Sequence, residues 1–175
     1  NGLTGCIDRY FFNEPHVHGG HDHSDGLTYR YGTGLRRVEN VPAHLALDTT
    51  TGVLYIADTG NGRIAKLDTR ATDLASATAI AGYHNETPLL RVPGARIDAV
   101  TPAGALTRPA GLIVSNGKLV VSDHGTGKLS IFAANGTLEG SADTGLGAGA
   151  LGGLVETRGG KLWVLDMAGG RVLEV

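Results

Sequence analysis

Hydrophobic and polar positions repeat along this chain as short strands joined by glycine-rich turns. Three segments align without a gap, at residues 52–67 (GVLYIADTGNGRIAKL), 117–132 (GKLVVSDHGTGKLSIF) and 160–175 (GKLWVLDMAGGRVLEV). Each holds a glycine, an apolar strand, an aspartate, a glycine-rich turn, a basic residue and a second strand. Short apolar runs bounded by such turns predict three β-hairpins.

Further apolar runs flank these hairpins. One precedes each hairpin, at residues 42–48, 109–115 and 152–156, and one follows each of the first two, at residues 77–82 and 137–141. Each repeat is therefore predicted to hold four strands.

The repeat length identifies the kind of sheet. The aspartates that close the second strand, Asp58, Asp123 and Asp166, are 65 and 43 residues apart, and an insertion at 83–106 lengthens the first interval. A period near 43 residues with four strands is typical of a propeller blade. The sequence predicts an all-β fold, a β-propeller of four-stranded antiparallel blades over 41–175. The predicted blades cover about 41–82, 107–144 and 150–175.

The first repeat resembles a known family. Its proline-led run at 42–48 (PAHLALD), followed by LYIADTGNGRI at 54–64, resembles the NHL repeat. In the second repeat Thr126 and Lys128 stand at the asparagine and arginine positions of that motif, and in the third Gly169 replaces the asparagine. The resemblance covers residues 41–175 and implies a propeller. Propellers host lyases, lactonases, ligand binders and interaction modules, so the fold leaves the function open.

Three blades are too few for a closed ring, because a propeller needs at least four. Residues 1–40 form a separate histidine-rich segment, in which 27–32 and 34–38 are candidate strands of a preceding blade or of the outer edge of the last. We expect an incomplete ring or a fragment of a six-bladed propeller. A protein partner, the remainder of a longer chain or another copy in a homo-oligomer would complete it, since open blades expose unpaired edges.

The polar residues that recur in the three repeats have structural interpretations. A short carboxylate accepts hydrogen bonds from backbone amides two residues on, so the three aspartates are expected to fix the glycine turns that follow them. The basic residues after those turns are expected to cover a neighbouring strand or to pair with an aspartate. These are Arg63, Lys128 and Arg171.

Composition removes several classes of partner. The net charge is −2 with no basic run, which disfavours nucleic acid and anionic lipid, and no apolar run is long enough for membrane insertion. A single cysteine, Cys6, excludes an internal disulfide. Two glycosylation sequons begin at Asn85 and Asn135 and suit an extracellular or periplasmic, secreted protein.

The N-terminal segment carries the densest candidate chemistry, PHVHGGHDHSDG at residues 15–26. Neutral imidazoles in a glycine-rich loop suit Cu, Zn or Ni ions. The candidate metal ligands are His16, His18, His21 and His23. A polar surface loop without metal is the competing interpretation.

Two further histidines are candidates for one mouth of the propeller. His44 lies where the first inner strand begins, at a position that is glycine in the other repeats, and His124 follows Asp123 in the second hairpin turn. Met167 follows Asp166 in the same way. Imidazole and thioether together suit copper or haem iron, whereas the simpler interpretation is that His124 is an exposed turn residue and Met167 a packing residue.

The sequence supports three functions in this order. The first is a non-catalytic binding or assembly scaffold, with a transition-metal site in the N-terminal segment. The second is a metal-dependent enzyme similar to the peptidylglycine-amidating lyase propeller. That resemblance implies a Pro-His step into the inner strands, whereas here Ala43 follows Pro42 and the histidine comes one residue later. The third is an accessory subunit of an electron-transfer assembly. No nucleophile–base pair stands out.

Overall fold

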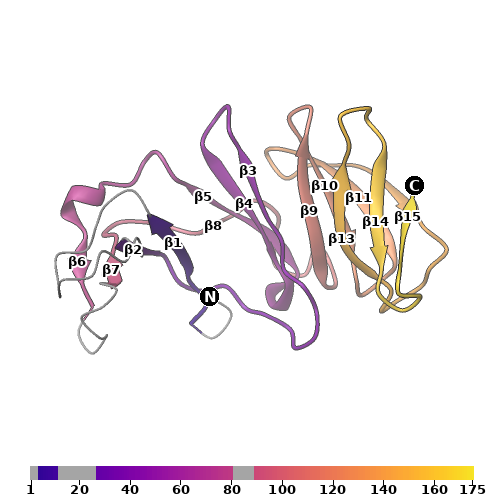
Figure 1. Ribbon diagram of the computed structural model, residues 1–175, viewed down its shortest axis with the longest axis horizontal. Coiled ribbons are helices and arrows are strands. Elements are labelled where there is room, and N and C mark those ends of the chain that lie inside the picture. Colours follow the sequence, from indigo (N-terminus) through magenta and orange to yellow (C-terminus); the bar gives the residue numbers. More distant parts are fainter. Residues whose placement is uncertain (1–3, 12–26, 81–88) are drawn as a thin grey trace, which may run out of the picture.

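Residues 4–11, 27–80 and 89–175 are described by the computed structural model. Within these ranges the strands form four sheets, accompanied by two short 3-10 helices, η1 (Thr59–Asn61) and η2 (Leu74–Ser76). The sheets follow one another along the longest direction of the molecule (Figure 1). The prediction of an all-β fold with propeller-like blades is confirmed, and the described sheets do not form a closed ring.

The first blade consists of β3 (Leu45–Asp48), β4 (Val53–Asp58), β5 (Arg63–Asp68) and β8 (Asp98–Ala99). All of its strand pairs are antiparallel. The last four residues of β4 are buried in succession, because neighbouring sheets cover both faces of this strand.

The second blade takes its four strands from one continuous stretch of the chain. It contains β9 (Pro109–Ser115), β10 (Lys118–Asp123), β11 (Lys128–Ala133) and β12 (Leu138–Asp143), paired in chain order and antiparallel throughout. The turn between β9 and β10 places Asn116 at φ 50° and the glycine after it at φ 74°. Two residues with positive φ are what a tight two-residue hairpin turn requires.

The third blade has three described strands, β13 (Leu151–Glu156), β14 (Leu162–Asp166) and β15 (Arg171–Glu174). The first strand of this blade, β13, lies beside β9 of the second blade. The last strand, β15, forms the opposite edge of the sheet (Figure 1).

A fourth sheet lies on the other side of the first blade and is called the N-terminal sheet here. Its strand order is β1 (Ile7–Phe11), β2 (Leu27–Tyr31), β7 (Leu89–Arg91) and β6 (Thr78–Ala79). The β2–β7 pair is parallel, unlike any pair in the three blades, and joins strands from distant parts of the chain. The predicted strand at 27–32 is confirmed as β2.

Two strand predictions are wrong. The outer strand of the first blade is β8, from within the predicted insertion, whereas residues 78–79 pair with β7 in the N-terminal sheet. The outer position is fixed by hydrogen bonds that the amides of Val100 and Thr101 donate to the carbonyl of Ile64. Residues 34–38 form no strand, because the backbone amides of Leu35 and Arg36 bond to Gly5 and to the side chain of Asp58 instead.

Three hydrophobic clusters fill the interfaces between successive sheets. Tyr29 and Tyr31 of the N-terminal sheet pack against Ile56 and Leu67 of the first blade. Ile64 of the first blade belongs to the cluster shared with the second blade. A third cluster lies between blades two and three and consists of Leu129, Leu151, Leu154 and Val164. Each blade is therefore stabilised mainly by its neighbours, as in repeat proteins generally.

Candidate functional site at the inner edge

The inner strands of the blades meet at one edge of the molecule. β3, β9 and β13 lie side by side there, and the amide of His44 donates a hydrogen bond to the carbonyl of Ala110 at 2.9 Å. The loop that leads into each inner strand contacts the turn between the second and third strands, as in the bond from the Gly60 amide to the Arg36 carbonyl at 2.7 Å. We call the end of the blades that these loops and turns form the mouth.

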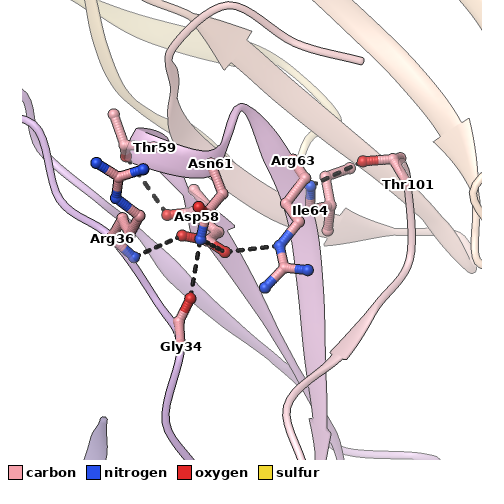
Figure 2. Close-up of polar contacts among 9 residues, drawn as sticks. Gly34, Arg36, Asp58, Thr59, Asn61, Arg63, Ile64 and Thr101 are labelled. Carbon is pink, nitrogen blue, oxygen red and sulfur yellow. Dashed lines mark hydrogen bonds and ion pairs between the residues drawn. The ribbon is translucent and has the colours of Figure 1, made fainter. Parts of the chain in front are cut away.

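Asp58 organises the mouth of the first blade. Its side chain is fully buried and accepts hydrogen bonds from the backbone amide of Arg36 at 2.8 Å, from Asn61 Nδ2 at 2.8 Å and from Arg63 Nε at 2.7 Å. Asn61 also donates to the carbonyl of Gly34 (Figure 2). One carboxylate thus joins the hairpin turn to a loop more than twenty residues earlier.

The same aspartate position uses different partners in the other blades. Asp123 accepts from the amides of Thr107 at 2.9 Å, Arg108 at 2.8 Å and Gly125 at 2.9 Å, so backbone donors replace the asparagine and arginine of the first blade. Asp166 accepts from the Gly169 amide at 2.9 Å and from Arg171 Nε at 3.0 Å. These bonds, the Gly169 amide first, lower the pKa of the Asp166 carboxyl below its ordinary value.

The structural interpretation of the repeat polar residues therefore holds for most of them. Asp123 and Asp166 fix their own glycine turns, whereas Asp58 fixes side chains and the preceding loop. Arg63 and Arg171 pair with aspartates. Lys128 has no ion pair within the described part of the chain.

The residue after each anchor aspartate bonds to the next blade. Thr59 Oγ1 donates to the carbonyl of Pro109 at 2.7 Å, and His124 Nδ1 lies 2.9 Å from the carbonyl of Leu151. Pro109 and Leu151 are the first residues of their inner strands, so the two contacts are equivalent. A carbonyl only accepts, so His124 must carry a proton on Nδ1 in this contact. Met167, at the same position of the third blade, is 38% exposed.

His44 reaches across the inner edge. A methyl group added at Gly153 of β13 would lie 2.6 Å from Cε1 and 2.7 Å from Nε2 of His44, so the imidazole rests directly on that glycine. Burial lowers the pKa of His44 below its ordinary value of 6.5. His44 and His124 therefore both contact β13, at residues 153 and 151.

Sequence reasoning missed Ser122, whose hydroxyl joins the second and third blades. Its hydroxyl accepts from the amide of Gly111 at 2.8 Å and donates to the carbonyl of Gly152 at 2.5 Å. Ser122 is completely buried. The sequence offered one signal for this role, a hydroxyl at a position that is alanine or leucine in the other repeats.

The remaining sequence candidates are placed as follows. Asn135 is exposed in the β11–β12 turn, and its Oδ1 accepts from the amide of Thr137 at 3.0 Å. Asn85 and the four histidines at 16, 18, 21 and 23 lie outside the described residues. Among residues 4–11, 27–80 and 89–175, no three His, Cys, Asp or Glu side chains are grouped as metal ligands, and no helix has the length and apolar character that a membrane span requires.

Comparison with known proteins supports the fold. No protein-family model and no curated protein matches the chain. Among solved structures, the glutaminyl cyclase of Myxococcus xanthus matches at 22% identity and a TM-score of 0.46, over 80% of this chain and 50% of that one. A gluconolactonase from Xanthomonas campestris matches at 19% identity and a TM-score of 0.50, over 79% and 41%. Virginiamycin B lyase from Staphylococcus aureus matches at 10% identity and a TM-score of 0.39, over 97% and 73%.

These neighbours are β-propeller proteins, and at such identities the similarity concerns the fold alone. The chain spans about half the length of the glutaminyl cyclase and less of the gluconolactonase. The chain has the β-propeller fold. Membership of the NHL group stays a prediction.

Proposed function

We propose that this chain is a non-catalytic β-propeller scaffold that assembles by docking a further four-stranded blade onto the free face of its third blade. The observation that carries the proposal is the exposure of two apolar side chains on that face. Leu165 of β14 is 39% exposed and Val172 of β15 is 57% exposed.

The equivalent positions of the other blades are buried. Leu165 precedes the anchor aspartate, as do Ala57 (1% exposed) and Ser122 (0%). Val172 is the second residue of the third strand, as are Ile64 (0%) and Leu129 (9%). In blades one and two the next blade covers these positions. The occupant that fits the third blade is therefore a sheet of the same kind.

The inner strand of the first blade has an open face as well. Leu45 of β3 is 52% exposed, whereas its equivalents Leu112 and Leu154 are 2% and 6% exposed because the preceding blade covers them. The N-terminal sheet packs on Ile56 and Leu67 of the first blade but leaves Leu45 beside a cavity of about 160 Å³. Apolar side chains are thus exposed on the third blade and on the inner strand of the first blade.

Two hypotheses accompany this proposal. The two glycosylation sequons are compatible with an extracellular or periplasmic location. The single cysteine allows no internal disulfide and does not argue against this location. The histidine-rich N-terminal segment is proposed to bind a Cu, Zn or Ni ion, so the scaffold would carry a metal ion in this segment.

The assembly is tested by measuring the mass of the chain in solution by light scattering over a wide range of protein concentration. The free blade face should drive concentration-dependent association, and the double variant L165K/V172K should be monomeric because lysines on that face oppose packing. Leu138→Lys is the matched control, since Leu138 is 56% exposed on the outer strand β12, away from the blade face. It should associate like the unmodified chain.

Two results would overturn the proposal. One is a monomeric mass for the unmodified chain at all concentrations. The other is equal association of the unmodified chain and L165K/V172K. Both variants replace exposed residues, so circular dichroism should show the same fold for all three proteins.

A further inference from the structure

A second cavity, of about 630 Å³, lies beside the N-terminal sheet and is distinct from the mouth. It is formed by the ends of β2 and β7 together with the loop at residues 92–98. Its volume falls in the range of small-molecule sites. Three arginines contribute to its lining, Arg30, Arg91 and Arg96, with Asp98 as the acidic residue among them.

Two of these arginines are nearest neighbours across a strand pair. Arg30 of β2 and Arg91 of β7 are directly paired in the parallel register, and Asp8 of β1 is the register partner of Arg30 on its other side. The row across the sheet therefore reads Asp8, Arg30, Arg91. Like charges directly opposite one another on neighbouring strands are destabilising.

The carboxylate of this row forms an ion pair with Arg30. Asp8 receives both Arg30 Nε and Nη2 at 2.8 Å, in a bidentate pair whose side chains are each 12% exposed. Among the described residues, the ion pair of Asp8 is with Arg30 and not with Arg91.

The other acidic residue does not balance Arg91 either. Asp98 lies 3.5 Å from Arg96 Nε, and the two side chains are 52% and 82% exposed, so this pair is weak and screened by water. Among the described residues, Arg91 forms no ion pair. The lining of the cavity thus contains the exposed Arg91, which has no ion pair among the described residues, and the loosely paired Arg96.

We propose that this cavity binds a small oxyanion, the carboxylate or phosphate group of a small molecule, through Arg91 with the help of Arg96. The planar guanidinium provides two parallel N–H donors that match either group. A bound anion would also offset the positive charge of Arg91 beside Arg30, its register partner. This inference concerns a different sheet from the proposed docking face and does not depend on it.

The test measures binding of inorganic phosphate and of citrate to the full chain by titration calorimetry at low and constant ionic strength, with chloride as the reference anion. Saturable binding of phosphate, citrate or both is expected, together with a rise in the Tm. Binding of one of the two anions alone would identify which of the two groups the cavity takes. Arg91→Gln should weaken binding at least about tenfold.

The matched control is Arg158→Gln, an exposed arginine of the β13–β14 loop that no contact ties to the cavity. It should bind the anions like the unmodified chain. In the absence of anion, R91Q should have a Tm no lower than the unmodified chain, because Arg91 is exposed and forms no ion pair among the described residues, so loss of binding would not come from misfolding. The proposal is overturned if neither anion binds saturably, if R91Q binds normally, or if R158Q weakens binding as much as R91Q.

Discussion

The buried carboxylate of Asp58 accepts a hydrogen bond from the backbone amide of Arg36 at 2.8 Å, across 22 positions of the sequence. Asp123 makes the equivalent bond to the amide of Arg108 in the second blade. In the first two blades the aspartate of the repeat therefore fixes the backbone of the loop that leads into its own inner strand. This loop forms part of the mouth, so the shape of the mouth depends on the buried aspartates.

Asp58→Ala should lower the free energy of unfolding by about 3 kcal/mol. The substitution leaves the Arg36 amide and the Asn61 side chain without their acceptor and removes the partner of Arg63. Losing a buried acceptor of charge-assisted hydrogen bonds has an effect of about this size. Urea unfolding followed by circular dichroism measures it.

Asp68→Ala is the control for this prediction. Asp68 accepts from the amides of Arg70 and Ala71, but in an exposed turn where water can replace it. The change should cost less than about 1 kcal/mol. Equal effects of D58A and D68A would contradict the anchoring role of Asp58.

Two glycines of the inner strands should respond differently to alanine. A Cβ at Gly111 would lie 2.6 Å from Ser122 Oγ and 2.8 Å from the carbonyl oxygen of Gly152, so backbone must move, and G111A should cost about 2 kcal/mol. A Cβ at Gly153 would meet only the ring of His44 among its close neighbours. The destabilisation by G153A should therefore be smaller and should disappear when His44 is also replaced by alanine.

A double-mutant cycle of G153A and H44A measures this coupling from the urea unfolding of four proteins. Additive effects of the two substitutions would show that His44 does not rest on Gly153. Retention of full stability in G111A would contradict the close approach of β9 to β13.

The repeats of the sequence were sufficient to predict most of the three blades. The hairpins at 52–67, 117–132 and 160–175 are all present, because turn glycines and apolar strands are local signals. The N-terminal sheet was not predicted in the same detail, since β7 pairs in parallel with a strand far away in sequence, and the three residues of β7 carry little local pattern. The outer strand β8 has two residues and was missed for the same reason.

The candidate site was predicted less completely than the fold. The positions of His44 and His124 at the inner edge followed from alignment of the repeats, but their contacts with β13 depend on how the blades pack together. The pairing of Arg30 with Arg91 depends on the parallel register of β2 and β7, which no local pattern specifies.

His124 should be replaceable by threonine but not by alanine. Thr59 makes the equivalent interblade bond with its hydroxyl, so H124T can donate to the Leu151 carbonyl, whereas H124A leaves this carbonyl without its donor. The expected loss is about 1 kcal/mol for H124A and clearly less for H124T. Chemical unfolding of the three proteins measures the difference, and a loss of equal size in both variants would argue against the interblade bond.

Stability should fall when the pH drops below about 6.5, and His44 should account for part of the fall. Burial lowers the folded-state pKa of His44, so the unfolded chain takes up a proton at a higher pH than the folded chain does. The contribution of the neutral imidazole is complete above the ordinary value of 6.5 and is lost as the pH falls through the lowered folded-state pKa.

His44→Gln should flatten this part of the pH dependence. The measurement is urea unfolding at several pH values between neutral and mildly acidic, for the unmodified chain and for H44Q. An unchanged slope in H44Q would contradict the assignment, as would an NMR titration of the His44 ring with a pKa at or above 6.5.

Asp166 should also make the protein less stable as the pH falls, as His44 does, but at more acidic pH. Its carboxyl has a lowered pKa because the Gly169 amide and Arg171 bond to the charged form. Its contribution is complete above the ordinary value of 3.8 and is lost as the pH falls through the lowered folded-state pKa. In D166N the acid limb of the stability curve should be shallower, and an unaltered acid limb would contradict this role.

The histidine-rich segment gives the prediction on metal binding. Four imidazoles within eight residues, in a glycine-containing stretch, suit one Cu, Zn or Ni ion. Purified protein should contain about one such ion per chain by elemental analysis, and a chelator should remove it without unfolding the blades, because the blade cores are formed by residues outside this segment. Replacing His16, His18, His21 and His23 with alanine should abolish metal binding, whereas H44A and H124A should retain it. Loss of metal in H44A or H124A would instead favour a metal at the mouth and the metal-dependent enzyme, and a metal-free native protein would remove both hypotheses.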